Sequence, residues 1–303
     1  MNYRILGKTN LQVSEIGFGT WPLGGICYGS VNTKDAIALL KLSFEMGINF
    51  FDTANVYGNG QSEYALGQAF KSQRTKIIIG TKIGWTKEGL NEQNFSKSFF
   101  VHRLNSSLTQ LKTDHVDILY MHSPYKKDFS EELKNTLLKF KKEGKVRFLG
   151  VSIRKPNDGF YFLQKNCFDV IQVNYNIAET ESEETGLIKS CYNKNIGVVA
   201  KVPLGYGFLT GKYEINHKFA KGDHRNRFTI GEREKWVNAV KKARELSLLK
   251  KHVTLTQIAL NFCLSNPKIG CIIPGIKTTS NLIENMKVVN LRRLTINERK
   301  LLL

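Results

Sequence analysis

Four residues that can take part in proton transfer follow or end short apolar runs of the chain. Asp52 and Tyr57 come just after one run, Lys82 closes the next, and His122 follows the run after that. Burying a lysine ammonium in an apolar strand is costly unless an anion pairs with it, so we expect Lys82 to contact Asp52. Each residue alone is typical of an ordinary turn or core position. Four of them on three consecutive runs instead predict an acid–base site, in which Lys82 lowers the pKa of the Tyr57 phenol.

Eight short runs rich in β-branched and aromatic residues alternate with stretches of helical periodicity. The runs are Ile16–Gly19, Ile48–Phe51, Ile77–Ile83, Val116–Met121, Val146–Val151, Val170–Val173, Val198–Val202 and Ile269–Ile273. The helical stretches are 33–46, 61–72, 95–111, 129–143, 156–165, 180–194, 232–249 and 255–265. Capping-box spacing at Thr180 and at Thr254 marks two helix starts. Nearly continuous apolar strands between helices indicate a parallel sheet, and eight such units predict an α/β fold, a (β/α)8 TIM barrel, as one domain over 1–303.

The main alternative is an open, doubly wound sheet, which normally has a glycine-rich phosphate turn after its first strand. Here Gly17 and Gly19 are followed by Thr20-Trp21-Pro22, so the third glycine is missing and the proline blocks the expected helix. The barrel is therefore favoured. Residues 2–15 are expected to form a hairpin that closes its bottom, and the long connection 203–231 is a candidate binding loop.

The 303-residue chain carries 45 Lys and Arg against 26 Asp and Glu, a formal net charge of +19. The basic residues are scattered rather than interleaved with aromatic residues in one tract, so we expect a solvated basic surface and no nucleic-acid partner. The apolar runs are far shorter than the roughly 20 residues of a membrane span, and the first residues lack the features of a signal peptide. We expect a cytoplasmic protein without a membrane partner. Its five cysteines are widely spaced, so we expect them to be reduced and buried, with no metal site.

A set of short motifs occurs in a specific order along nearly the whole chain. The motifs are Tyr3-Arg4-Ile5-Leu6-Gly7, Ile16-Gly17-Phe18-Gly19-Thr20-Trp21, Phe51-Asp52-Thr53-Ala54, Tyr57-Gly58, Ser62-Glu63, Ser107-Leu108-Thr109-Gln110-Leu111, Asp114-His115-Val116-Asp117, Gly144-Lys145-Val146-Arg147, Gly150-Val151-Ser152, the run from Pro203 to Tyr213, Ile273-Pro274-Gly275 and Glu284-Asn285. In this order they resemble the aldo-keto reductase superfamily. The resemblance implies an NADP(H)-dependent oxidoreductase that reduces an aldehyde or ketone to the alcohol. It also implies that Tyr57 is the general acid, that Lys82, held by Asp52, tunes Tyr57, and that His122 orients the carbonyl.

By the same resemblance, NADP(H) is bound by residues at several strand ends. The resemblance implies that the nicotinamide carboxamide is bound by Ser152 and Gln172, and the pyrophosphate by the loop 204–207. It implies likewise that the 2′-phosphate is bound by Lys277 and the adenine by residues 284–285. The full set of implied cofactor residues is Thr20, Trp21, Ser152, Gln172, Lys201, Pro203, Leu204, Gly205, Gly207, Gly275, Lys277, Asn281, Glu284 and Asn285.

Several positions depart from the family pattern. Lys201 stands where many members stack an aromatic residue on the nicotinamide, and Ile153 stands where many have asparagine. Lys277 replaces the commoner arginine, and Asn281 replaces a longer polar side chain. Because lysine lacks the bidentate fork with which arginine binds phosphate, we expect Lys277 to favour NADP(H) less strictly than an arginine would.

The substrate pocket above Tyr57 is expected to be walled by aromatic side chains and one cation. These are Trp21, Tyr28, Trp85, Tyr125 and Arg154. With Lys201 and Arg154 nearby, a sugar, or a phosphorylated or nucleotide-linked sugar, is the hypothesis for the small-molecule carbonyl substrate. One alternative is a non-catalytic regulatory subunit, like the potassium-channel beta subunits that resemble these enzymes. It predicts cofactor binding with negligible turnover.

Overall fold

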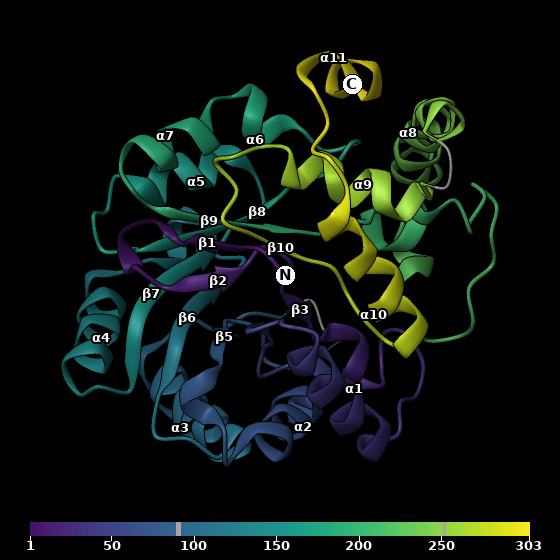
Figure 1. The fold of residues 1–303 in the computed structure, drawn as a ribbon. Coiled ribbons are helices and arrows are strands. Elements are labelled where there is room, and N and C mark those ends of the chain that lie inside the picture. Colours follow the sequence, from purple (N-terminus) through teal and green to yellow (C-terminus); the bar gives the residue numbers. More distant parts are fainter. Residues whose placement is uncertain (89–91, 251–252) are drawn as a thin grey trace.

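The computed structural model describes residues 1–88, 92–250 and 253–303, and it is organised around a parallel barrel (Figure 1). Eight parallel strands pair in the order in which they follow one another along the chain, and bridges from Ile16 to Ile272 and from Gly19 to Gly275 join the first strand to the last. The barrel strands are β3 (Phe18–Gly19), β4 (Phe50–Asp52), β5 (Ile78–Ile83), β6 (Val116–His122), β7 (Val146–Ser152), β8 (Val170–Asn174), β9 (Gly197–Lys201) and β10 (Cys271–Ile273). This arrangement confirms the predicted (β/α)8 barrel and excludes the open sheet.

Helices surround the barrel on its outer side (Figure 1). They are α1 (Thr33–Glu45), α2 (Gln61–Phe70), α3 (Lys97–Leu111), α4 (Glu131–Lys142), α5 (Pro156–Leu163), α6 (Glu181–Glu184), α7 (Leu187–Asn193), α8 (Ile230–Leu249), α9 (Leu255–Leu264), α10 (Thr279–Met286) and α11 (Ile296–Leu302). Apart from α6, which contains no apolar residue, these helices contribute apolar side chains to one large core cluster that also contains the outward residues of the strands. Among the described residues, no helix is both long and apolar enough to span a membrane.

The strand boundaries differ from the predicted ones by one or two residues at most ends. The first strand begins at Phe18 rather than Ile16, because Ile16 makes only an isolated bridge. At their other ends, four strands run one residue further than predicted and take in Asp52, His122, Ser152 and Asn174. Val202 leaves β9, since its φ of 57° lies outside the extended region. The polar residues at the strand ends are therefore held by sheet hydrogen bonds.

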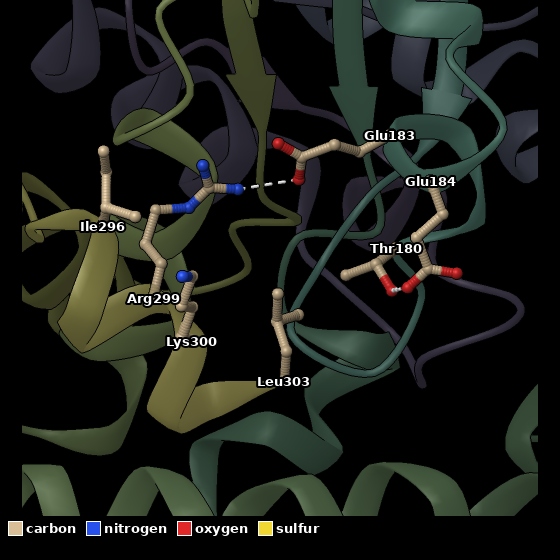
Figure 2. A pocket seen from close by; sticks show the side chains of 7 residues that line it. All are labelled: Thr180, Glu183, Glu184, Ile296, Arg299, Lys300 and Leu303. Atoms are coloured by element: carbon tan, nitrogen blue, oxygen red, sulfur yellow. Dashed lines mark hydrogen bonds and ion pairs between the residues drawn. The ribbon is translucent and has the colours of Figure 1, made fainter.

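The single helix predicted over 180–194 is wrong, because the chain forms α6 and α7 with Gly186 at φ 78° between them. The capping box predicted at Thr180 is also wrong. The Thr180 hydroxyl donates to the Glu184 carboxylate at 2.5 Å instead of accepting from the helix backbone, while Glu183 pairs with Arg299 of α11 at 2.7 Å (Figure 2). The box at Thr254 is confirmed, and it starts α9.

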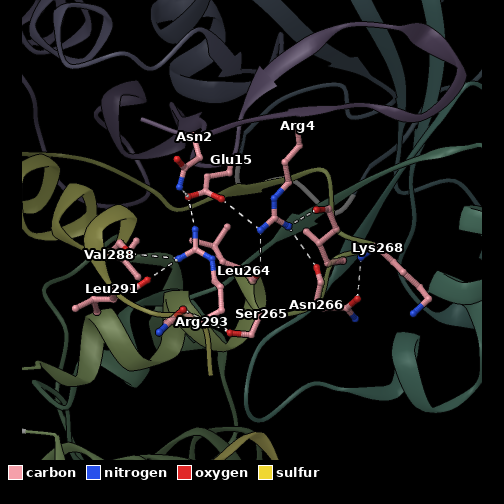
Figure 3. A network of polar contacts seen from close by, with 12 residues as sticks. Asn2, Arg4, Glu15, Leu264, Ser265, Asn266, Lys268, Val288, Leu291 and Arg293 are labelled. Atoms are coloured by element: carbon pink, nitrogen blue, oxygen red, sulfur yellow. Dashed lines mark hydrogen bonds and ion pairs between the residues drawn. The ribbon is translucent and has the colours of Figure 1, made fainter. Parts of the chain in front are cut away.

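The N-terminal hairpin of β1 (Tyr3–Ile5) and β2 (Gln12–Ser14) closes the bottom of the barrel, as predicted. Its apolar residues Leu6, Leu11 and Val13 are buried against the barrel interior. The buried Glu15 carboxylate pairs with Arg4 at 3.3 Å and with Arg293, so the N-terminal hairpin and the segment between α10 and α11 are joined at this face (Figure 3). In barrels of this kind the active site lies at the opposite face, at the carboxyl-terminal ends of the strands.

The five cysteines are all free thiols. Four of them are buried, but the expectation of burial is wrong for Cys167, which is partly exposed in the turn after α5. Within the described parts of the chain, no three His, Cys, Asp or Glu side chains gather as metal ligands.

Candidate active site

Polar side chains form the last interior layer of the barrel at its carboxyl-terminal face. Phe50, Tyr120, Val170 and Val199 belong to the apolar cluster inside the barrel. Because the side chains of a strand alternate between its two faces, residues two positions later point into the same interior. These residues are Asp52, His122, Gln172 and Lys201. The alternation of the sequence therefore brings the polar strand ends together.

The predicted pairing of Lys82 with Asp52 is present at the centre of this layer. The Lys82 ammonium donates to the Asp52 carboxylate, to the Thr53 carbonyl oxygen at 2.9 Å and to the Tyr57 hydroxyl at 3.2 Å. Lys82 is 2% exposed and Asp52 3% exposed, so the pair is shielded from water. The His122 ring lies edge-on to the Tyr57 ring, with 6.1 Å between centroids. The side chains of all four predicted residues therefore lie together in this layer.

The prediction that Lys82 lowers the pKa of Tyr57 is wrong for the structure as described. Burial, together with the Asp52 and Glu88 carboxylates, raises the pKa of the Tyr57 phenol well above its ordinary value. Burial and the nearby Lys82 cation lower the pKa of the His122 imidazole well below its ordinary value. At neutral pH Tyr57 is therefore protonated and His122 is uncharged.

A tight turn aims Tyr57 at Lys82. Gly58, with φ 60°, lies so close to the loop after β3 that a Cβ atom there would be 2.1 Å from the Gly24 carbonyl oxygen. The Trp21 ring stacks on the Tyr57 ring, with 5.7 Å between centroids. Glu88 holds both loops, because its carboxylate accepts from the Trp21 indole at 2.7 Å and from the Gly58 amide at 2.5 Å. Glu88 was not predicted as a site residue, because it follows β5 in a segment without a recognisable pattern.

Unpartnered polar atoms lie beside this acid–base group. The Gln172 amide nitrogen donates to Asp52, while its buried Oε1 has no partner among the described residues, and neither does Oδ1 of Asn174. Ser152, at the end of β7, is also buried. Thr20 is fixed to the strand framework, since its hydroxyl donates to the Asp52 carbonyl oxygen at 3.0 Å. Free acceptors of this kind fit the NH2 group of a carboxamide, which is the group predicted for Ser152 and Gln172.

The other predicted cofactor residues lie after β9 and after β10. Pro203, Leu204, Gly205 and Gly207 lead into and begin a 3-10 turn at Gly205–Thr210, and Gly275 bridges to Gly19. Asn281 lies in the first turn of α10, which Thr278 caps. The Lys277 ammonium donates to the Tyr28 carbonyl oxygen at 2.6 Å.

The two residues predicted at the adenine have different surroundings. The Glu284 carboxylate accepts from the side chains of Thr254 and, at 3.1 Å, Gln257, so it is tied to the start of α9. Asn285 is 2% exposed, and its side-chain nitrogen has no partner in the described parts of the chain. Of this pair, Asn285 has the unused hydrogen-bond donor.

The residues predicted to line the substrate pocket fall into two side-chain clusters. On one side the Arg154 guanidinium lies over Tyr125 at 4.4 Å and over Trp85 at 5.3 Å from the ring centroids, and it donates to the Ser123 carbonyl oxygen at 2.8 Å. On the other side Trp21 and Tyr28 pack edge to face, with 5.2 Å between centroids. The Arg154 guanidinium is thus oriented by these two aromatic rings and the Ser123 carbonyl oxygen.

His224, from a 3-10 turn in the connection 203–231, packs against the cluster of Trp21 and Tyr28. Its ring centroid lies 4.4 Å from that of Trp21 and 4.5 Å from that of Tyr28. Burial lowers the pKa of this imidazole to about 3, so it is uncharged at neutral pH. The connection 203–231 was predicted as a binding loop, but His224 was not predicted, because only the folded loop brings it against Trp21 and Tyr28.

Comparisons with known proteins agree with this architecture. The aldo/keto reductase family profile matches residues 15–302. An L-galactose dehydrogenase of Arabidopsis thaliana is 32% identical over 94% of this chain and 87% of its own length. A probable voltage-gated potassium channel subunit beta of the same plant is 31% identical over 96% of this chain and 92% of its own length.

Among solved structures, an aldo-keto reductase from Bacillus halodurans in its holo form superimposes with a TM-score of 0.82 at 26% identity. The similarity covers 100% of this chain and 95% of the Bacillus protein. The chain therefore belongs to the aldo/keto reductase family, whose members use a nicotinamide cofactor to reduce carbonyl groups to alcohols.

Proposed function

We propose that this protein is an NADP(H)-dependent reductase that converts an aldehyde or ketone to the alcohol, with Tyr57 as the general acid. The observation that carries the proposal is the buried contact set of Lys82 with Asp52 and the Tyr57 hydroxyl. The partly buried Tyr57 hydroxyl lies 3.2 Å from the buried ammonium, which places a positive charge where a tyrosinate formed during turnover would need it.

The residues divide the chemistry as follows. When bound, the reduced nicotinamide supplies a hydride to the carbonyl carbon. Tyr57 gives its proton to the carbonyl oxygen, and the adjacent Lys82 ammonium stabilises the tyrosinate that remains. The uncharged His122 orients the carbonyl oxygen by a hydrogen bond. Asp52 keeps Lys82 in place and charged, so it is a positioning residue.

The cofactor assignment is supported by the unused polar atoms around the layer. Oε1 of Gln172 suits the nicotinamide amide, and the side-chain nitrogen of Asn285 suits a ring nitrogen of adenine. Lys277 is the residue we assign to the 2′-phosphate, and it gives up its contact with the Tyr28 carbonyl oxygen to do so. On this basis NADPH binds more tightly than NADH.

A sugar is the substrate class that we propose, and anionic forms such as phosphorylated sugars are included. The similarity to a protein named L-galactose dehydrogenase supports a sugar, and Arg154 at the rim supports an anionic group on it. Comparing kcat/KM for an aldose and for its phosphorylated form at low salt tests the second part. Better turnover of the neutral sugar at low salt would refute it.

The decisive experiment uses Tyr57→Phe. We expect this variant to bind NADPH as the wild type does, seen by quenching of tryptophan fluorescence, and to lose roughly 10²–10⁴-fold in carbonyl reduction. Unchanged turnover would remove Tyr57 from the role of acid. Binding of neither NADPH nor NADH to the wild type would refute the reductase assignment itself.

The second candidate function is a regulatory subunit that binds the cofactor without significant turnover. It is favoured by the similarity to a probable potassium channel subunit beta. The two functions separate in one assay, a screen of aldehydes and sugars with saturating NADPH. Wild-type turnover that Tyr57→Phe abolishes supports the reductase, whereas tight NADPH binding with no turnover of any carbonyl supports the regulatory subunit.

A further inference from the structure

Lys201 is a cation in the interior layer of the barrel without a counter-ion of its own. It ends β9 two residues after Val199, so it points into the barrel interior, and it lies opposite Asn174 of β8. It is partly buried, and among the described residues its ammonium makes no hydrogen bond or ion pair. The acid–base scheme above does not use this residue.

The two carboxylates whose charges act on Lys201, those of Asp52 and Glu179, already accept hydrogen bonds from other side chains. Asp52 accepts from Lys82 and from Gln172. Glu179 accepts from Asn176 at 2.7 Å, from the Trp236 indole at 3.2 Å and from Lys235 at 3.3 Å. With Asp52 balanced by Lys82, the ammonium of Lys201 leaves the interior layer with an excess positive charge.

The excess charge matters because the nicotinamide ring carries one positive charge when oxidised and none when reduced. The unpartnered acceptors of Gln172 and Asn174 lie on the strand next to Lys201, and Tyr57 and His122 meet in the same layer. A ring that offers its amide to these acceptors and its hydride to a carbonyl at Tyr57 therefore feels the charge of Lys201. Like charges in a partly buried site repel strongly, because water screens them poorly.

We infer that Lys201 makes the site discriminate between the two redox states of its cofactor, so that NADPH binds more tightly than NADP⁺. This inference rests on the proposed function, since it requires a nicotinamide in the barrel mouth. It gives Lys201 a role that differs from stacking on the ring: it weakens the binding of the oxidised product and so speeds its release after reduction.

The test measures the dissociation constants of NADPH and NADP⁺ separately, by tryptophan fluorescence or calorimetry, for four proteins at pH 7. These are the wild type, Lys201→Met, Lys201→Arg and Lys194→Met. In Lys201→Met we expect the ratio of the NADP⁺ to the NADPH constant to fall roughly tenfold, as for unit charges about 10 Å apart at an effective dielectric constant of about 20. Lys201→Arg keeps the charge and the ratio. Lys194→Met removes an exposed lysine just before the same strand and leaves the ratio unchanged.

A second measurement needs no methionine variant at position 201, so it holds even if that variant fails to fold. Burial and the nearby Lys82 lower the pKa of Lys201 to about 8, while Glu179 and Asp52 raise it and Arg154 lowers it further. The ratio in the wild type therefore falls between pH 7 and pH 9, as the ammonium loses its proton. In Lys201→Arg it stays constant, because a guanidinium does not titrate in this range. The Lys201→Arg comparison also excludes Lys82 as the titrating group.

Three outcomes would overturn the inference. If the ratio is unchanged in Lys201→Met, whether both affinities stay the same or both fall by the same factor, the charge of Lys201 does not act on the charge of the ring. A pH dependence that persists in Lys201→Arg would assign the titration to another group. If the wild type binds neither form, the proposed function fails first, and this result is distinct from binding without discrimination.

Discussion

Removing the Lys82 ammonium tests the centre of the proposed site without an activity assay. Lys82→Met leaves the Asp52 carboxylate, 3% exposed, with Gln172 as its remaining side-chain donor. Breaking a buried ion pair from one side costs about 3–5 kcal/mol, because the other charge remains buried without its partner. For a chain of this length each kcal/mol lowers Tm by roughly 2 °C, so we expect Tm to fall by about 6–10 °C at pH 7.5.

The cost in Lys82→Met also has a direction with pH. Burial raises the pKa of Asp52, and the Lys82 ammonium opposes this effect in the wild type. Without Lys82 the pKa of the folded-state carboxyl rises further above the unfolded value of about 3.9. The folded variant then binds a proton more tightly than the unfolded chain, so the cost is small near pH 4 and grows as pH rises through the folded-state pKa.

Calorimetry at pH 5 and pH 8, with the wild type measured at each pH, gives the required differences in Tm. We expect a smaller deficit for Lys82→Met at pH 5 than at pH 8. The control is the double variant Lys82→Met/Asp52→Asn, which removes both charges and is expected to recover most of the lost stability. An equal deficit at both pH values, or a double variant as unstable as the single one, would refute the account of Asp52 as a buried charge.

Three further substitutions test separate parts of the structure. Gly58→Ala must move the turn that carries Tyr57, because its Cβ atom meets the Gly24 carbonyl oxygen, so we expect at least a tenfold loss of kcat with NADPH binding retained; wild-type kcat would contradict this. Lys277→Met is expected to raise KM for NADPH several-fold more than KM for NADH, and equal changes would end its assignment to the 2′-phosphate. Arg293→Met removes one ion-pair partner of the buried Glu15 at the barrel bottom, so we expect the free energy of unfolding to fall by about 1–3 kcal/mol while kcat stays unchanged. A variant with altered kcat but wild-type Tm would contradict this purely structural role of Arg293.

The fold and three of the four acid–base residues were predictable because they depend on patterns along single strands, whereas Tyr57 lies in the loop after β4. Continuous apolar runs such as Ile77–Ile83 indicated a buried parallel sheet, and the period of two fixed which end residues point inward. Asp52, Lys82 and His122 each lie two residues beyond an interior position, so their meeting follows from strand alternation and barrel closure.

Residues on loops were not predictable in this way. Glu88 and His224 reach the site through loop conformations that tertiary contacts determine, with Trp21 as a shared contact. The break at Gly186 was missed because the helical periodicity continues across it. The pattern at Thr180 does not show that its backbone, at φ −103° and ψ −2°, lacks the extended conformation of an N-cap residue. A capping sequence starts a helix only where the backbone of its first residue takes the extended conformation that the N-cap position requires.

The error about Tyr57 changes the role that Lys82 must have. A cation beside a phenol lowers its pKa, but burial and two carboxylates outweigh that effect in the structure and keep Tyr57 protonated. A protonated tyrosine is the form that a general acid needs before the reaction, so a lowered resting pKa is not required. If Tyr57 is the acid, as proposed, the Lys82 ammonium 3.2 Å from its hydroxyl stabilises the phenolate that forms once the proton has moved. In the proposed mechanism Lys82 therefore acts on the product of proton transfer, and Asp52 keeps that ammonium charged before the transfer occurs.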